Sequence, residues 1–267
     1  MKKTVGLFGC GSLATIIGET LENDPDKAYE IVSVYDHGPA KAVALARRLG
    51  CEAATTWEAF LSVPMDYVIE AAAPSALKSA GPQILSAGHD LIVLSAGAFA
   101  DAAFEKDLNA AAEASDRKVY VASGAIGGFD ALQTVALMGI TKAAVINEKP
   151  PGAFAGAPVL TDRTLSESAV EVLFEGNAVE AIRAFPKNVN VAVAAARLGG
   201  GLADTRIVIK SIPGMKDNSH RIVVEGDFGK LDMTFVSAPS KANPGSSAMA
   251  AYSVIALLKK LNSRIEW

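Results

Sequence analysis

The first half of the chain alternates short, mostly apolar runs with stretches of helical periodicity, and this alternation restricts its fold more than any other feature. The predicted strands cover residues 4–8, 31–35, 67–70, 91–94 and 119–122. Helical stretches separate them, and Pro74 falls at the first turn of one, where proline is well tolerated. Apolar strands that alternate with helices are typical of a parallel sheet covered on both faces.

The pattern changes after residue 124. Here the predicted strands follow one another without long crossovers, which favours antiparallel pairing in an α+β domain; they cover residues 205–212, 221–225 and 231–236. Helices are expected from 128 to about 139 and over 166–174, 177–185 and 246–261. We therefore expect a first domain at 1–124, a second, mostly antiparallel domain at 125–240, and a C-terminal helix within 241–267 that packs back on the rest.

A glycine turn joins the first strand to the first helix. Gly9 and Gly11 follow the strand, and Ser12 and Leu13 open the helix. Gly9 permits a tight turn, Gly11 lets the backbone approach a pyrophosphate, and Ala14 allows close packing of helix and strand. The N–H groups and the positive dipole end of the helix would then face the phosphates. An ordinary glycine turn is the alternative, but the strand–turn–helix context predicts a Rossmann doubly wound parallel sheet that binds a dinucleotide.

An acid stands at the end of the second predicted strand. Asp36 can accept hydrogen bonds from both ribose hydroxyls of an adenosine and repels a 2′-phosphate, which favours NAD. His37 and Lys41 lie nearby in the sequence and leave NADP possible. The alternative role for Asp36 is that of a turn or helix-capping residue.

Two segments of small residues follow strand ends on the carboxyl side of the predicted sheet, where ligands bind. Ala72 lies in the first segment, and Ser95, Ala96 and Gly97 form the second. Small side chains there leave room for a cofactor, although close packing of helix and strand would explain them equally well.

Histidine suits proton transfer near neutral pH, and the chain has three. His37 adjoins the predicted adenosine end, and His89 precedes a strand at the amino edge of the sheet. His220 begins a strand in the second domain and is the candidate catalytic residue by elimination. A surface turn histidine is the alternative for this position.

The segment around residues 185–190 combines a cation with amides before an apolar stretch. Lys187 and Asn188 are therefore candidates for binding an anionic substrate or a nicotinamide amide, and Lys149 is a weaker candidate. A loop before a helix, with Asn190 as its cap, is the alternative. No cluster of metal-ligand type is apparent, so no metal is predicted.

Composition excludes several other classes of protein. The net charge of −4 provides no basic surface for nucleic acid. No apolar run reaches the roughly 18 residues of a membrane helix. Two cysteines, Cys10 and Cys51, cannot form a disulfide framework, which fits a reducing cytoplasm. We expect a soluble, cytoplasmic protein with a small-molecule substrate.

Several segments together resemble the L-aspartate dehydrogenase family over nearly the whole chain. They are residues 9–11, 124–128, 185–192, His220 with 223–229, and 242–244 with Ser247. The resemblance implies NAD- or NADP-dependent oxidation of L-aspartate through iminoaspartate to oxaloacetate and ammonia. It further implies a link to NAD biosynthesis and a homo-oligomer (dimer or tetramer). It also implies that His220 is catalytic and that Ala125 and Asn190 contact the nicotinamide.

The sequence departs from the family pattern at three places. Ser219 stands where valine is usual, Gly245 where lysine is common, and Ala14 where glycine is usual. The first two fall near the expected substrate site. A related dehydrogenase of another small amino or keto acid therefore remains an alternative, as does a non-catalytic dinucleotide-binding sensor.

Overall fold

The computed structural model describes residues 2–186, 190–240 and 243–265. The chain divides into two compact units. Unit 1 comprises Met1–Ala98, Ala102–Ala122 and Ala250–Trp267, and unit 2 comprises Phe99–Asp101 and Ser123–Met249. Within the described ranges, no helix is long and apolar enough to cross a membrane.

Unit 1 is built around a parallel sheet with the strand order β3-β2-β1-β4-β5-β6. Its strands are β1 (Lys3–Phe8), β2 (Tyr29–Tyr35), β3 (Glu52–Ala53), β4 (Tyr67–Glu70), β5 (Asp90–Val93) and β6 (Val119–Val121). This is the doubly wound order of dinucleotide-binding folds, in which the direction of winding reverses between β1 and β4. The predicted Rossmann sheet is confirmed, and the reversal marks the carboxyl edge of the sheet as the place for a ligand.

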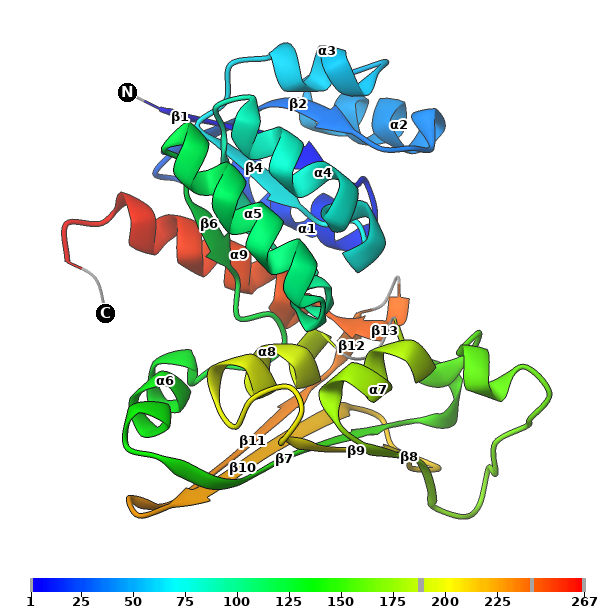
Figure 1. Cartoon of the computed structure of the whole chain (residues 1–267). Coiled ribbons are helices and arrows are strands. Elements are labelled where there is room, and N and C mark those ends of the chain that lie inside the picture. The colour runs from blue at the N-terminus through cyan, green and yellow to red at the C-terminus, as the bar shows by residue number, and fades with distance from the viewer. Residues whose placement is uncertain (1, 187–189, 241–242, 266–267) are drawn as a thin grey trace. The chain divides into compact units, whose positions relative to one another are not determined.

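Helices cover both faces of this sheet (Figure 1). The helices of unit 1 are α1 (Ser12–Glu22), α2 (Pro39–Leu49), α3 (Trp57–Ser62), α4 (Pro74–Ser86), the short η1 (Ala96–Ala100), α5 (Ala102–Ser115) and α9 (Ala248–Asn262). Pro39 and Pro74 each occupy the first turn of a helix, where the missing N–H is not needed. Gly50 ends α2 with a φ of 68°, a left-handed conformation that favours glycine.

The C-terminal helix α9 completes one of these faces. Its buried residues Ala251, Val254, Ile255 and Leu258 join a single apolar cluster with residues of α1, α2 and the sheet. The hydroxyl of Tyr29, on β2, donates a buried hydrogen bond of 2.6 Å to the Leu258 carbonyl. The end of the chain is therefore part of the core of unit 1.

Unit 2 contains a mixed sheet with the order β11-β10-β7-β9-β8, in which β7 and β9 are parallel and the other neighbours are antiparallel. Its strands are β7 (Ile140–Lys149), β8 (Glu171–Gly176), β9 (Arg206–Ser211), β10 (Asn218–Gly226) and β11 (Gly229–Ser237), and a separate pair is β12 (Pro239–Ser240) with β13 (Asn243–Ser247). The predicted mostly antiparallel second sheet is confirmed.

Helices pack against one face of the unit 2 sheet (Figure 1). They are α6 (Phe129–Leu137), α7 (Ala178–Ala184) and α8 (Asn190–Leu198), with the short η2 (Pro151–Phe154) and η3 (Pro158–Leu160). Small residues on α7 and α8, such as Ala181 and Ala195, lie in the same apolar cluster as Val145 and Ile207 of the sheet. Small side chains at the contact allow the helices to approach the strands closely.

One prediction for unit 2 differs from the structure, and one strand was missed. The helix expected over residues 166–174 is wrong, because Glu171–Gly176 forms the edge strand β8. Val172 and Phe174 favour strand geometry, and pairing with β9 decides the outcome. The long strand β7 was not expected, although it lies in the middle of the sheet.

Candidate active site

The glycine turn of unit 1 has the geometry that a bound pyrophosphate requires. Gly9 has a φ of 93°, and a Cβ there would lie 2.7 Å from the Ala71 carbonyl oxygen, so a larger residue does not fit. Gly11 is exposed, and a Cβ there would meet no heavy atom within 4 Å. The open side of Gly11 at the start of α1 is therefore a cradle that any side chain would begin to fill. The residues present fit a dinucleotide.

Asp36 ties this turn to the end of β2. Its Oδ2 accepts a hydrogen bond of 2.8 Å from the Cys10 N–H, and its Oδ1 accepts one of 2.7 Å from the Gly38 N–H. A carboxylate offers about four acceptor positions, so two hydrogen bonds leave capacity for ribose hydroxyls. The turn-forming role and the cofactor-binding role predicted for Asp36 are therefore compatible.

A buried carboxyl that the sequence analysis did not single out connects the next two strand ends. Glu70, the last residue of β4, is fully buried. Its Oε1 accepts hydrogen bonds from the Ala72 N–H at 2.8 Å and the Ser95 hydroxyl at 2.7 Å, and its Oε2 accepts one from the Ser95 N–H at 2.9 Å. Burial raises the pKa of this carboxyl above its ordinary value, and the hydrogen bonds oppose that change. Glu70 thus holds together the two loops that follow β4 and β5.

The small residues predicted at these strand ends differ in accessibility. Ala72 is exposed and can be reached by a ligand. Ser95, Ala96 and Gly97 are buried, and the Ser95 side chain already contacts Glu70. In this segment, small side chains serve close packing at the carboxyl edge of the sheet.

One face of the unit 2 sheet changes from apolar to polar along its strands. The apolar part includes Val145, Ile207 and Ile222, which belong to the core under the helices. Further along the same face lie polar side chains from β7, β9, β10 and β11, which we call the polar sheet end: Asn147, Lys149, Ser211, Asn218, His220 and Ser237. The strand alternation places all of them on one face, because residues two apart point the same way.

The polar sheet end contains buried atoms without hydrogen-bond partners among the residues that the structure describes. They are Asn147 Nδ2, Ser211 Oγ, Asn218 Oδ1 and Ser237 Oγ. A buried polar atom that lacks a partner is unfavourable, and native proteins tolerate few of them. Their concentration at one place indicates a site that a polar ligand completes.

His220 is the titratable centre of this cluster. It is 3% exposed, and its Nδ1 lies 2.7 Å from Asn147 Oδ1 on the neighbouring strand. Burial, with a further contribution from the Lys149 ammonium, lowers the pKa of His220 to about 3. Burial likewise lowers the pKa of Lys149 to about 8. At neutral pH the site therefore holds a neutral imidazole beside a cation, and the alternative of a surface turn histidine is wrong.

The other two histidines lie in unit 1 and have different surroundings. His89 is buried, with Nδ1 2.9 Å from the Met65 carbonyl oxygen and Nε2 2.9 Å from the Leu61 carbonyl oxygen. His37 is exposed. The backbone contacts on both ring nitrogens of His89 indicate a structural role.

The remaining predicted site residues belong to unit 2. Ala125 is half-buried in the segment after β6, and Asn190 is the half-buried first residue of α8. Lys187 and Asn188 lie outside the described residues. Within the described ranges, no group of three or more histidine, cysteine or acidic side chains is arranged to hold a metal.

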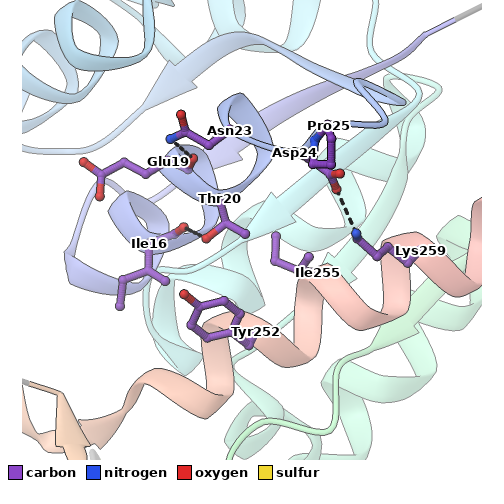
Figure 2. Close-up of a pocket in the computed structure, with 9 residues that line it drawn as sticks. All are labelled: Ile16, Glu19, Thr20, Asn23, Asp24, Pro25, Tyr252, Ile255 and Lys259. Carbon is purple, nitrogen blue, oxygen red and sulfur yellow. Dashed lines mark hydrogen bonds and ion pairs between the residues drawn. The ribbon is translucent and has the colours of Figure 1, made fainter.

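A groove of about 630 Å³ on unit 1 lies between α1 and α9 (Figure 2). It is lined by residues from the C-terminal part of α1, at the other end of the helix from the glycine turn. Several of its polar groups already have partners: Thr20 donates to the Ile16 carbonyl, and Asp24 pairs with Lys259 at 3.2 Å. Size alone does not make this groove the functional site, since the unpaired polar atoms lie elsewhere.

A doubly wound unit with this glycine turn, in one chain with a unit that buries a histidine and a lysine, is the arrangement expected of an NAD(P)-dependent dehydrogenase. Residues 9–122 match the family described as homoserine dehydrogenase, NAD binding domain, and residues 130–261 match aspartate dehydrogenase, C-terminal. The L-aspartate dehydrogenases of Methanosarcina acetivorans and Methanosarcina barkeri are 35% and 36% identical to this chain, with 98% of each chain covered. The chain belongs to the L-aspartate dehydrogenase family.

A solved structure supports the same assignment. The crystal structure of aspartate dehydrogenase from Thermotoga maritima aligns over 100% of both chains with a TM-score of 0.76 and 26% sequence identity. The similarity therefore extends over both units and is not limited to the dinucleotide-binding fold.

Proposed function

We propose that this protein oxidises L-aspartate with NAD, or with NADP, and that it hydrolyses the resulting iminoaspartate to oxaloacetate and ammonia. The observation that carries the proposal is the polar sheet end, where a neutral histidine, a buried lysine and unpaired polar atoms gather in a chain of this family. A dicarboxylic amino acid supplies the acceptors and donors that such a cluster lacks.

The chemistry divides between cofactor and protein. A bound nicotinamide would supply the acceptor for the hydride of the substrate Cα–H bond, so that the amine becomes an imine. Water then adds to the imine carbon, and the Nε2 atom of His220 accepts a proton from that water. His220 returns that proton to the nitrogen as the C–N bond breaks and ammonia leaves, and the hydroxyl loses the second proton of the added water as the carbonyl forms. Overall, one water is consumed, and one ammonium and one proton are released, for each hydride transferred.

Lys149 is the proposed partner of a substrate carboxylate. Aspartate carries two carboxylates, and each loses hydration in a closed site, so each needs a charge-assisted partner. Lys149 is 5% exposed and lies on the same face of the sheet as His220. Lys187 and Asn188, from the segment most specific to the family, are the proposed partners of the second carboxylate.

The cofactor half of the proposal rests on unit 1. Gly9, Gly11 and the start of α1 would hold the pyrophosphate, and Asp36 would accept the ribose hydroxyls. Ala125 and Asn190 are the proposed nicotinamide contacts, by resemblance to the family. A carboxylate at position 36 repels a 2′-phosphate, so we propose NAD as the preferred cofactor.

By resemblance to the family, we further propose a homo-oligomeric state, a place in NAD biosynthesis and a cytoplasmic location. The free thiols of Cys10 and Cys51 are in keeping with a reducing compartment. Sedimentation of the purified protein would give the oligomeric state directly.

The deciding experiment is a series of kcat/KM values for aspartate, glutamate, asparagine and alanine with NAD, read at the absorbance band of the reduced nicotinamide. We expect kcat/KM for aspartate to exceed that for alanine by about 100-fold or more, because alanine lacks the second carboxylate that the proposed site binds. Equal rates for the two would contradict the dicarboxylate site. Cofactor binding without turnover on any amino acid would instead identify a sensor.

A further inference from the structure

Asn147 faces the proposed catalytic histidine directly. The register of β7 and β10 pairs Asn147 with His220 across the antiparallel ladder. The amide oxygen lies 2.7 Å from the ring Nδ1, and both side chains are almost completely buried, at 1% and 3% exposure.

This contact determines which ring nitrogen carries the proton. Burial keeps the imidazole neutral at physiological pH, so the ring has one N–H and one lone pair. An amide oxygen is only an acceptor, and it therefore stabilises the tautomer with the proton on Nδ1. In that tautomer Nε2 is unprotonated and can act as the base.

The amide nitrogen of the same side chain has no partner yet. Asn147 Nδ2 is buried and makes no hydrogen bond to any residue in the described part of the chain. The Lys149 ammonium stands on the same strand and the same face, so an anion bound here would reach both groups. A carboxylate oxygen satisfies an N–H donor in such a place better than a neutral group does.

We infer that Asn147 is a bifunctional positioning and substrate-binding residue, whose amide oxygen holds the Nδ1–H tautomer of His220 while its amide nitrogen donates to a carboxylate oxygen of the bound amino acid. The inference rests on the proposed function for the identity of that amino acid. It explains why an amide suits this position. An aspartate carboxylate would accept from Nδ1–H but repel the substrate carboxylate, and a leucine side chain could neither accept from Nδ1–H nor donate to the substrate.

The first test reads the tautomer without any turnover. In the full-length protein labelled with ¹⁵N-histidine, we expect His220 to be protonated at Nδ1 in the wild type and in Asn147→Asp, and to lose this preference in Asn147→Leu. His89, in unit 1, should give the same signal in all three proteins and serves as the internal reference. An Nε2–H tautomer in the wild type would overturn the positioning role, whatever the substrate proves to be.

The second test separates the two ends of the amide by kinetics. Asn147→Asp should raise KM for the amino acid by about 10-fold or more and leave KM for NAD unchanged, since a donor to the carboxylate is lost. Asn147→Leu should in addition lower kcat by about 10- to 100-fold, the size of effect known for loss of the partner that orients a metal-bound histidine. An unchanged KM for the amino acid in Asn147→Asp would overturn the substrate-binding role.

Val145→Ala is the matched control on the same strand. Val145 is buried on the same face two residues earlier and belongs to the apolar core. This variant should lower the melting temperature while the His220 tautomer and both KM values stay as in the wild type. If it shifted the tautomer as Asn147→Leu does, general loosening of β7 would account for the result and the inference would fail.

Discussion

Replacing Lys149 by methionine should make the protein more stable and much less active. Lowering a lysine pKa from 10.5 to about 8 corresponds to about 3 kcal/mol of unfavourable burial of the ammonium at neutral pH. Methionine has a similar length and no charge, so Lys149→Met removes that penalty. For a unit of this size we expect unit 2 to melt about 10 °C higher at pH 7.

The gain should depend on pH in a defined direction. Below about pH 8 the folded state carries the buried charge, and the full difference between Lys149→Met and wild type is present. Between about pH 8 and the unfolded-state pKa of 10.5, Lys149 has lost its proton in the folded state but keeps it in the unfolded chain. The wild type therefore becomes more stable as the pH rises through this range, and the stability difference between Lys149→Met and the wild type decreases. In the wild type, deprotonation of Lys149 above about pH 8 should also raise KM for aspartate.

Scanning calorimetry at pH 7 and pH 9.5, together with kcat/KM for aspartate, provides the measurement. Lys142→Met is the control, because Lys142 lies on the same strand with its side chain 79% exposed. The Lys142→Met substitution should change the free energy of unfolding by less than about 0.5 kcal/mol at either pH. A Lys149→Met protein that is less stable than the wild type at pH 7, or a difference that does not vary with pH, would refute the reasoning.

Three further predictions concern the proposed catalytic and cofactor-binding residues. His220→Ala should lower kcat by about two to four orders of magnitude with little change in KM for NAD, and activity near that of the wild type would mean that water alone moves the protons. The wild type should have a higher kcat/KM with NAD than with NADP, and Asp36→Ser should narrow that ratio; a wild-type preference for NADP would contradict the role of the carboxylate. Glu70→Leu should destabilise unit 1 by about 3 kcal/mol or more in urea denaturation, because the Ala72 and Ser95 donors lose their buried acceptor, and an unchanged midpoint would show that the loops are held by other contacts.

Most of unit 1 could be predicted from the sequence, because its constraints are local. Each central parallel strand is buried on both faces and reads as an apolar run, and the glycine turn adds a motif of fixed spacing. In unit 2 the structure depends on pairing between distant segments. β8 is a short edge strand whose sequence after Ser166 also suits a helix, and only pairing with β9 distinguishes the two.

The same distinction separates the site residues that could be found from those that could not. His220 was identified by elimination among three histidines. Glu70 and Asn147 were missed, because their roles come from contacts across the sheets: Glu70 meets a loop 25 residues later in the chain, and Asn147 meets a side chain 73 residues later. A sequence read along the chain gives no signal for such contacts unless the strand register is known.

The return of the chain to unit 1 sets the order in which the protein can be completed during synthesis. The nucleotide-binding unit begins at the N-terminus, but its core includes α9, which is made only after all of unit 2. At about 5 to 20 residues per second, the ribosome needs about 6 to 25 seconds to pass from the end of β6 at Val121 to the start of α9 at Ala248. During that interval the apolar surface around Tyr29 and Ile16, beside which α9 lies in the finished protein, is open to water and to chaperones. A nascent chain that stops before residue 250 would therefore carry a complete parallel sheet with one face unfinished, and it should be a target for the proteases that clear incomplete proteins.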